Sequence, residues 1–417
     1  MTIRLGILGA TRGLNFALAA MEHNLDLEVA AVCDYFPPLL EKVKANLPGN
    51  SFSPAYYTDF SDMIQNTPLD AVVIANNANE HARYAIEALK HGLHVLSEVL
   101  PVQTPAEAVA LCEAVEKSGK KYFYAENYCY MRPNFEAALR YRRGEIGTIV
   151  EGECDFVNDC SQRWHLLTRG QRDHWRNFVP STFYCTHSIG PMIYALQDRV
   201  ETVTGFEVPC LDYMREHGAR SGSAAMEVMK LKNGAILKSV HGNLKRSWVT
   251  RMRLTGTKGT LETQNGQISM NLENEAKNGY DVQTPDYTQI LNLSNDVMNR
   301  FDPFQLACVI AAMNGDAEAE KWCIDVYMAL DMAMPGLFAY RSILAGNIPL
   351  AVPDFRLPEV REAYRNDHSC TDAKIASGAD LLPSCSMEDV QIPESVYERE
   401  QALLYESLEK NFKLGMN

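Results

Sequence analysis

Two hydrophobic patterns divide the chain, and the change between them falls near residue 148. Before it, short apolar runs alternate with segments whose apolar residues recur every three or four positions. Strands that alternate with helices in this way predict a parallel sheet covered by helices on both faces. The predicted strands are 3–9, 27–33, 71–75, 94–97 and 121–125, and the clearest helices between them are 80–91 and 105–118.

After residue 148, strand-like runs are separated by turn sequences such as Asn-Gly at 233–234, which is typical of an antiparallel sheet. We therefore predict a doubly wound α/β domain over 1–126, followed by an α+β domain over 127–356 with a large, mostly antiparallel sheet. Some helices of the second domain are expected to pack on the first, and 357–417 is a C-terminal extension. The predicted strands are 148–156, 200–208, 223–232, 236–243, 250–254 and 259–263, and the predicted helices are 181–197, 303–346 and 394–412.

Composition narrows the class of protein. The 417 residues suffice for two or three domains, and the formal net charge of −14 argues against nucleic acid or an anionic membrane as partner. The eleven cysteines show no C-x-x-C spacing, so no metal site is expected, and free thiols suit a reducing compartment. There is no long apolar run and no signal-peptide pattern, which predicts a cytoplasmic protein without a membrane span.

A glycine turn follows the first predicted strand. Gly9, Thr11, Arg12 and Gly13 stand where a dinucleotide-binding fold carries G-x-G-x-x-G, with Thr11 in place of the second glycine. Asp34 ends the next strand, where a carboxylate accepts both ribose hydroxyls of NAD and repels the 2′-phosphate of NADP. These residues favour NAD, bound at a helix N-terminus. The alternative is a glycine turn in a doubly wound fold that binds nothing.

Polar residues end three further strands of the predicted parallel sheet. Asn76, Asn77 and His81 follow the third strand, Glu98 follows the fourth, and Asn127 follows the fifth. Because the carboxyl ends of parallel strands line the ligand crevice, we predict that these side chains contact the cofactor. Helix capping by the asparagines and an ordinary loop position for the glutamate are the alternatives.

Groups able to transfer protons lie in two other segments. Tyr130 follows the last strand of the first sheet, close to Arg132, and a phenol there could act as an acid or base. Tyr184 and His187 are three residues apart, which places them on one face of a predicted helix. Tyrosines packed between domains and a core histidine bonded to a carbonyl are the alternatives.

The irregular stretch 157–180 is rich in arginine, tryptophan and histidine. Four of its residues could select an acidic or acetamido group on a ligand, although arginines in a loop are usually only solvated: Arg163, Trp164, His165 and Arg172. Trp175 and Arg176 lie in the same stretch, just before the Tyr184–His187 segment.

Taken in order, these motifs resemble the Gfo/Idh/MocA oxidoreductases over about residues 2–356. The family usually carries Glu-Lys-Pro where this chain has Glu98-Val-Leu-Pro101, so the lysine that helps take a hydroxyl proton is missing. One branch, the NAD-dependent glycosidases typified by bacterial α-N-acetylgalactosaminidases, shows Glu-Val-Pro, Glu-Asn-x-Cys-Tyr and Tyr-x-Thr-His. The segments that resemble these motifs are Glu98–Pro101 with one inserted residue, Glu126–Tyr130 and Tyr184–His187, and the family's second domain is matched by 144–147, 232–235 and 256–262.

The resemblance implies a role for each matched residue. His187 with Glu98 would take the proton of the sugar 3-hydroxyl, and Tyr130 or Tyr184 would take the proton at carbon 2. A nearby arginine, Arg132 or Arg176, would lower the pKa of that tyrosine. The residues expected to bind the substrate are Arg176, Arg172, Trp175 and Asn127.

The resemblance also implies a reaction on a small sugar or glycoside. NAD would oxidise carbon 3 transiently, the aglycone would leave by elimination, water would add, and the ketone would be reduced again. Because the family commonly pairs through its exposed sheet, a homodimer or homotetramer is expected. Two alternatives stay open: an NAD-dependent sugar or glycoside 3-dehydrogenase that releases a keto-sugar, and a non-catalytic NAD(H)-binding sensor or scaffold.

Overall fold

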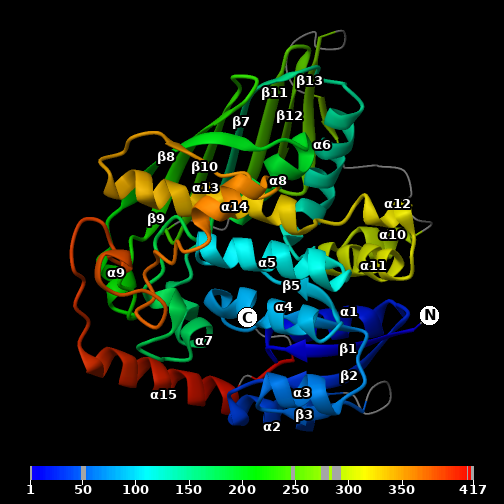
Figure 1. Cartoon of the computed structure of the whole chain (residues 1–417), viewed down its shortest axis with the longest axis vertical. Helices are drawn as coiled ribbons and strands as arrows, with labels where there is room; N and C mark the ends of the chain where they lie inside the picture. Colours follow the sequence, from blue (N-terminus) through cyan, green and yellow to red (C-terminus); the bar gives the residue numbers. More distant parts are fainter. Residues whose placement is uncertain are drawn as a thin grey trace.

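A computed structural model describes residues 2–47, 53–245, 249–273, 281–283, 293–410 and 412–414. The N-terminal apolar runs form six parallel strands in the order β3-β2-β1-β4-β5-β6, which is the order of dinucleotide-binding folds. Helices cover both faces of this sheet, so the predicted doubly wound architecture is confirmed (Figure 1). Its strands are β1 (Ile3–Leu8), β2 (Leu27–Cys33), β3 (Ala55–Tyr57), β4 (Ala71–Ile74), β5 (His94–Ser97) and β6 (Tyr122–Tyr124).

One helix of this sheet shows clearly how capping residues set its two ends. In α5 (Pro105–Ser118), the Thr104 side chain accepts from the Glu107 amide at 3.1 Å, proline takes the first turn, and Gly119 ends the helix in a left-handed conformation. Because the strand order reverses between β1 and β4, the crevice at their carboxyl ends is where a ligand is expected. The other helices are α1 (Arg12–Glu22), α2 (Pro37–Asn46), α3 (Phe60–Asn66) and α4 (His81–Lys90).

The second sheet has nine strands in the order β14-β13-β12-β11-β7-β10-β9-β8-β15. Only the central β7–β10 pair is parallel among the described strands, so the expected mostly antiparallel sheet is confirmed. The strands are β7 (Ile149–Val157), β8 (Val200–Val208), β9 (Ala224–Leu231), β10 (Ile236–Gly242), β11 (Val249–Gly256), β12 (Gly259–Gln264), β13 (Gln267–Leu272), β14 (Asp281–Gln283) and β15 (Leu350–Ala351).

The two faces of the nine-stranded sheet differ. One packs against α6 (Arg132–Arg142), α8 (Thr186–Leu196) and α13 (Val326–Leu344), as Figure 1 shows. The other exposes apolar side chains, among them Phe206 and Met226, which are paired across β8 and β9.

Three elements of the structure differ from the sequence prediction. The helix predicted at 181–197 begins only at Thr186. The helical region predicted at 303–346 is broken, because Gly315 adopts a φ of 91° just after α11 (Phe301–Met313) and a short α12 (Ala317–Glu320) intervenes before α13. Strand β13 was missed, although the Asn265-Gly266 turn before it is a hairpin signal.

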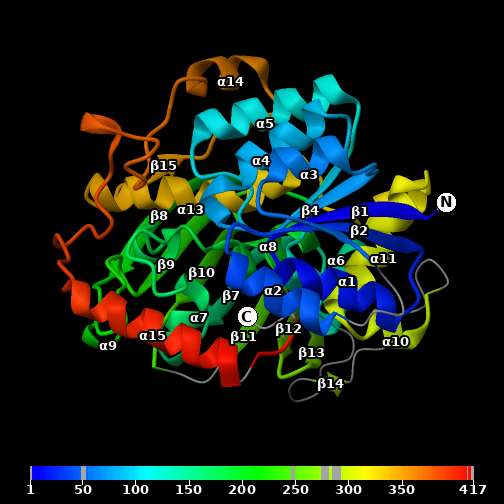
Figure 2. The same cartoon turned by 90° about the horizontal axis from the view of Figure 1, so that it is seen from below.

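The C-terminal extension runs back along the molecule. After α14 (Pro358–Tyr364), it ends in α15 (Glu394–Lys410), close to the predicted 394–412. Figures 1 and 2 both place α15 beside α7 (Trp164–Thr168), and the Tyr405 ring lies 6.4 Å from that of Phe36 at the start of α2. None of the described helices combines the length and apolarity needed to cross a membrane.

Candidate functional site

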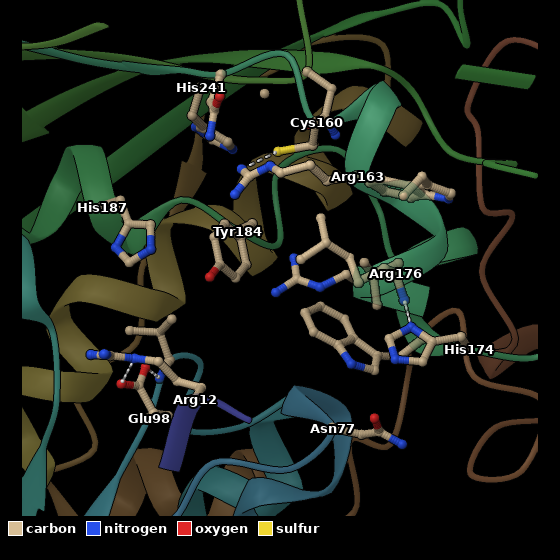
Figure 3. A pocket seen from close by; sticks show the side chains of 18 of the residues that line it. Arg12, Asn77, Glu98, Cys160, Arg163, His174, Arg176, Tyr184, His187 and His241 are labelled. Carbon is tan, nitrogen blue, oxygen red and sulfur yellow. Dashed lines mark hydrogen bonds and ion pairs between the residues drawn. The ribbon is translucent and has the colours of Figure 1, made fainter. Parts of the chain in front are cut away.

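A cleft of about 650 Å³ opens at the carboxyl ends of β1, β4 and β5 and extends under the second domain. Its floor comes from the first sheet, and its far wall comes from the irregular stretch around α7 and from α8 (Figure 3). Most of the predicted site residues line it: Thr11, Arg12, Asn76, Asn77, His81, Glu98, Asn127, Trp175, Arg176, Tyr184 and His187.

The glycine turn has the close packing that a dinucleotide turn requires. Gly9 adopts a φ of 100°, and a Cβ there would clash with the carbonyl oxygen of Ala75. A Cβ on Gly13 would lie 2.6 Å from Ile7, so this glycine lets α1 pack on β1. Thr11 and Arg12 at the start of α1 face the cleft, where helix amides can bind a phosphate.

Asp34 lies beneath the cleft and does not line it. Its carboxylate is 2% exposed and accepts hydrogen bonds from the amides of Ala10 and Phe36, both at 2.9 Å. Arg169, from the loop after α7, also binds both oxygens, at 2.9 and 3.1 Å. The sequence pattern located Asp34 but gave no sign of this arginine, which is 135 residues away.

The middle of the cleft carries polar groups suited to a nicotinamide nucleotide. The buried amide oxygens of Asn76 and Asn127 have no hydrogen-bond partner among the described residues. The His81 ring is held by the carbonyls of Leu100 at 2.9 Å and Asn76 at 3.3 Å, and burial lowers its pKa to about 4. With the glycine turn, these residues fit the NAD that the sequence predicts.

Glu98 is bound by an arginine that the sequence had assigned to the cofactor. The Arg12 Nε donates to Glu98 at 2.6 Å, and its two terminal nitrogens donate to Asp302 of α11, each at 2.6 Å. Burial raises the pKa of Glu98, and the guanidinium only partly opposes it. Asp302 was not predicted, because it lies 290 residues from Arg12 and belongs to no local motif.

A buried glutamate orients His187. The Nδ1 of His187 lies 2.7 Å from Glu126 Oε1, and the hydroxyl of Thr186 donates to Oε2 of the same carboxylate at 2.6 Å. Glu126 has no exposed surface, so its carboxylate fixes the ring and leaves Nε2 for the cleft. The sequence signal for Glu126 is its position directly after β6, within the Glu126–Tyr130 motif.

Tyr184 shares this wall with His187, but it is not suited to be a base. The two rings are 5.0 Å apart and nearly perpendicular, and the Arg176 guanidinium lies 5.0 Å from the Tyr184 ring. Burial raises the pKa of Tyr184, and Arg176 opposes this only in part. The phenol therefore stays protonated near neutral pH and can donate a hydrogen bond.

The structure does not bring Tyr130 or Arg172 to the cleft. Tyr130 is 1% exposed and packs among Phe135, Tyr194 and Phe304, with its hydroxyl donating to the Trp322 carbonyl at 2.6 Å. Burial raises its pKa well above the ordinary value, so we withdraw it as a base. Arg132 binds Asn299, away from Tyr184. Arg172 is exposed, pairs with Glu394 of α15 at 2.8 Å and lines a separate hollow, so we withdraw it as a substrate ligand.

Comparison with known proteins agrees with this geometry. Residues 3–126 match the profile of the oxidoreductase family described as having an NAD-binding Rossmann fold. This segment is similar to the Gfo/Idh/MocA oxidoreductases, the family that the sequence motifs resemble. It is an NAD-binding domain, as the sequence predicted.

Curated relatives extend the likeness into the second domain. A glycosyl hydrolase family 109 protein of Phocaeicola vulgatus is 24% identical over 277 residues, covering 62% of this chain and 59% of the relative. A protein with the same family name from Shewanella baltica is 26% identical over 228 residues, covering 50% and 48%. The chain thus spans about half to three fifths of the length of these relatives.

Solved structures share the two-domain fold. The WlbA dehydrogenase of Bordetella pertussis, in complex with NADH and UDP-GlcNAcA, has a TM-score of 0.68 at 19% identity, covering 84% of this chain and 98% of that one. An inositol dehydrogenase homologue of Azotobacter vinelandii, complexed with NAD+, also scores 0.68, at 16% identity and with coverage of 84% and 97%.

Proposed function

We propose that this Gfo/Idh/MocA protein is an NAD-dependent glycosidase that cleaves a sugar from its aglycone through transient oxidation at carbon 3. The likeness to proteins named glycosyl hydrolase family 109 supports this proposal, although their identity to this chain is low. The observation that carries it is the His187–Glu126 pair facing the same cleft as Glu98.

NAD supplies the hydride acceptor and donor for this reaction and is not consumed. His187 takes the proton of the 3-hydroxyl at Nε2, since Nδ1 is held by Glu126. The protonated Tyr184 donates a hydrogen bond to the sugar. Because neither tyrosine suits the role of base, Glu98 is the carboxylate available to take the carbon 2 proton as the bond to the aglycone breaks. The hydroxide of a water then adds to carbon 1 while its proton goes to the aglycone, and Glu98 returns its proton to carbon 2. His187 returns its proton to the carbon 3 oxygen when the ketone is reduced again.

The test follows two signals at once with a panel of aryl glycosides. Aglycone released over many turnovers, without net NADH absorbance, is the expected result. Stoichiometric NADH without aglycone would replace the proposal with a sugar or glycoside 3-dehydrogenase. Tight cofactor binding with neither signal on any sugar would point to a sensor or scaffold.

We also propose that two copies pair through the open face of the nine-stranded sheet. Phe206 and Met226 are 46% and 41% exposed there, and Val228 and Ile236 extend the apolar surface on neighbouring strands. Replacing Phe206 and Met226 with aspartate should give a monomer in sedimentation, whereas an unchanged mass would place the interface elsewhere.

A further inference from the structure

The outer half of the cleft carries two arginines that form no ion pair with the described residues. Arg163 and Arg176 both line the cleft, and Figure 3 shows them facing the cavity beside Tyr184. No carboxylate of the described residues forms an ion pair with either guanidinium. Among the described residues, the carboxylates that line the cleft are those of Glu98 and Asp302, and Arg12 binds both.

The histidines of the same wall do not change this balance. His187 is paired with Glu126, and His241 lies 3.3 Å from Glu227. Burial, together with Arg176 and Arg169, lowers the pKa of His174 well below its ordinary value, so His174 is neutral. The excess charge therefore belongs to the two arginines, in a protein whose net charge is −14.

The guanidinium of Arg176 is positioned to bind an oxyanion. Its guanidinium lies 4.3 Å from the Trp175 ring and 5.0 Å from the Tyr184 ring, so aromatic faces fix its plane. Its guanidinium also bonds the Tyr184 hydroxyl, and no carboxylate of the described residues pairs with it, so its charge can be met by an oxyanion such as a carboxylate, sulfate or phosphate. Arg163 is exposed, and among the described residues its side chain makes one weak bond, to the sulfur of Cys160 at 3.7 Å.

We propose that the substrate of this cleft is an anionic sugar, whose carboxylate, sulfate or phosphate group is bound by Arg163 and Arg176. The inference rests on the proposed action on sugars and names the class of sugar. It makes Arg163 a specificity residue, and it explains why neither guanidinium forms an ion pair with a carboxylate of the described chain.

Binding is tested without any need for turnover. With NAD present, quenching of the fluorescence of Trp164 and Trp175, which line the cleft, is titrated with galacturonate and galactose and with glucuronate and glucose. The acid should bind roughly tenfold or more tightly than its neutral partner, because hydrogen bonds to a charged group contribute that much. Sugar 6-sulfates and 6-phosphates in the same titration show which oxyanion is preferred.

Variants identify the residues responsible. Arg163→Ala and Arg176→Lys should each reduce the preference for the acid. Arg172→Ala, in the same loop but paired with Glu394, is the matched control and should leave it unchanged. Equal affinity for acid and neutral sugars, or a preference that survives both substitutions, would overturn the proposal. If acidic sugars bind through these arginines but are not turned over, the anionic-sugar proposal holds and the glycosidase proposal fails.

A separate observation concerns the ribose end of the cofactor site. A carboxylate offers roughly four acceptor positions. Asp34 uses two for the Ala10 and Phe36 amides and two for Arg169. A ribose hydroxyl can therefore donate to Asp34 only if Arg169 moves.

Arg169 is supported from outside by the C-terminal helix. It lies 4.6 Å from the Tyr35 ring and 5.2 Å from the Phe36 ring. The next residue, Gly170, packs so closely on the backbone of Gln401 in α15 that a Cβ would clash. Leu404 and Leu408 of α15 are buried and share a small hollow with Arg169.

We infer that Arg169, whose loop packs against α15, covers Asp34 at the ribose site. Arg169 moves away from Asp34 when the dinucleotide binds or leaves. Stopped-flow NADH fluorescence, with binding and then a chase by excess NAD+, measures both rates. Arg169→Ala should raise both by about tenfold or more, and Arg169→Lys by less, because a bidentate charged contact is lost. Arg172→Ala is again the control. Unchanged rates in Arg169→Ala would overturn the inference, whatever the sugar chemistry proves to be.

Discussion

The inner and outer ends of the cleft hold their arginines in opposite ways. At the inner end, Arg12 binds Glu98 and Asp302, and Arg169 binds Asp34, all at 2.6 to 3.1 Å. At the outer end, Arg163 and Arg176 have no carboxylate partner within the described chain. Positive charge that a carboxylate of the chain balances needs no anionic ligand, whereas a cation that lines a cleft without a carboxylate partner favours one.

The largest effect is expected where the two ends meet, at His187. His187→Ala should lower kcat by about 10²–10⁴-fold, the range usual for a lost general base, with little change in sugar affinity. Glu126→Gln should lower kcat as well, because the Nδ1 contact of 2.7 Å then no longer favours a protonated ring. Aglycone release under saturating substrate measures both.

Tyr130→Phe is the control for that experiment. Its hydroxyl faces the Trp322 carbonyl in the core, so this variant should keep its activity. A Tyr130→Phe enzyme as slow as His187→Ala would restore Tyr130 to the mechanism and undermine the assignment of His187.

The sequence predicts the site residues that end strands, but not the partners that distant segments bring to them. Asp34, Asn76 and Glu98 each end a strand, and strand ends are visible as local patterns because they converge at one edge of a parallel sheet. Their partners Arg169 and Asp302 are set by the packing of distant segments, which no local pattern records.

The direction in which a side chain points is the other feature that the sequence did not predict. Tyr130 and Tyr184 both stand beside motif residues, but Tyr130 lies in a short 3-10 turn that points its ring into the core. Tyr184 directly precedes α8 and faces the cleft. The two-domain architecture needed only periodicity and turn residues, so it was predicted, whereas the base for carbon 2 was not.

The next effect concerns stability and separates the two kinds of arginine. Arg12→Ala leaves two largely buried carboxylates without their partner and should destabilise the fold by on the order of 3–5 kcal/mol. Arg176→Ala, in the same cleft, should change stability by less than about 1 kcal/mol, because it breaks no ion pair. Urea unfolding without added ligand measures the stability of both variants. A similar loss of stability in the two would contradict the distinction between paired and unpaired arginines.

A smaller effect is expected from His81 at the inner end. Its folded pKa is lowered to about 4 by burial, so its neutral form stabilises the protein above pH 6.5, and this contribution is lost as the pH falls toward 4. The loss is about 3 kcal/mol over that range. His81→Asn should remove this part of the acid sensitivity in urea unfolding at stepped pH. Equal pH dependence in both proteins would show that His81 is not the responsible group.

The smallest effect is expected from Arg172, which belongs to neither end. Its pair with Glu394 is exposed on both sides, and such pairs contribute little to stability and weaken with salt. Arg172→Ala should therefore unfold at nearly the same urea concentration as the parent, and should bind acidic sugars as the parent does. If it weakened acid binding as much as Arg176→Lys, the positive charge of the whole loop would be selecting the ligand. Acid binding would then reflect a generally basic surface and not a specific anion site formed by Arg163 and Arg176.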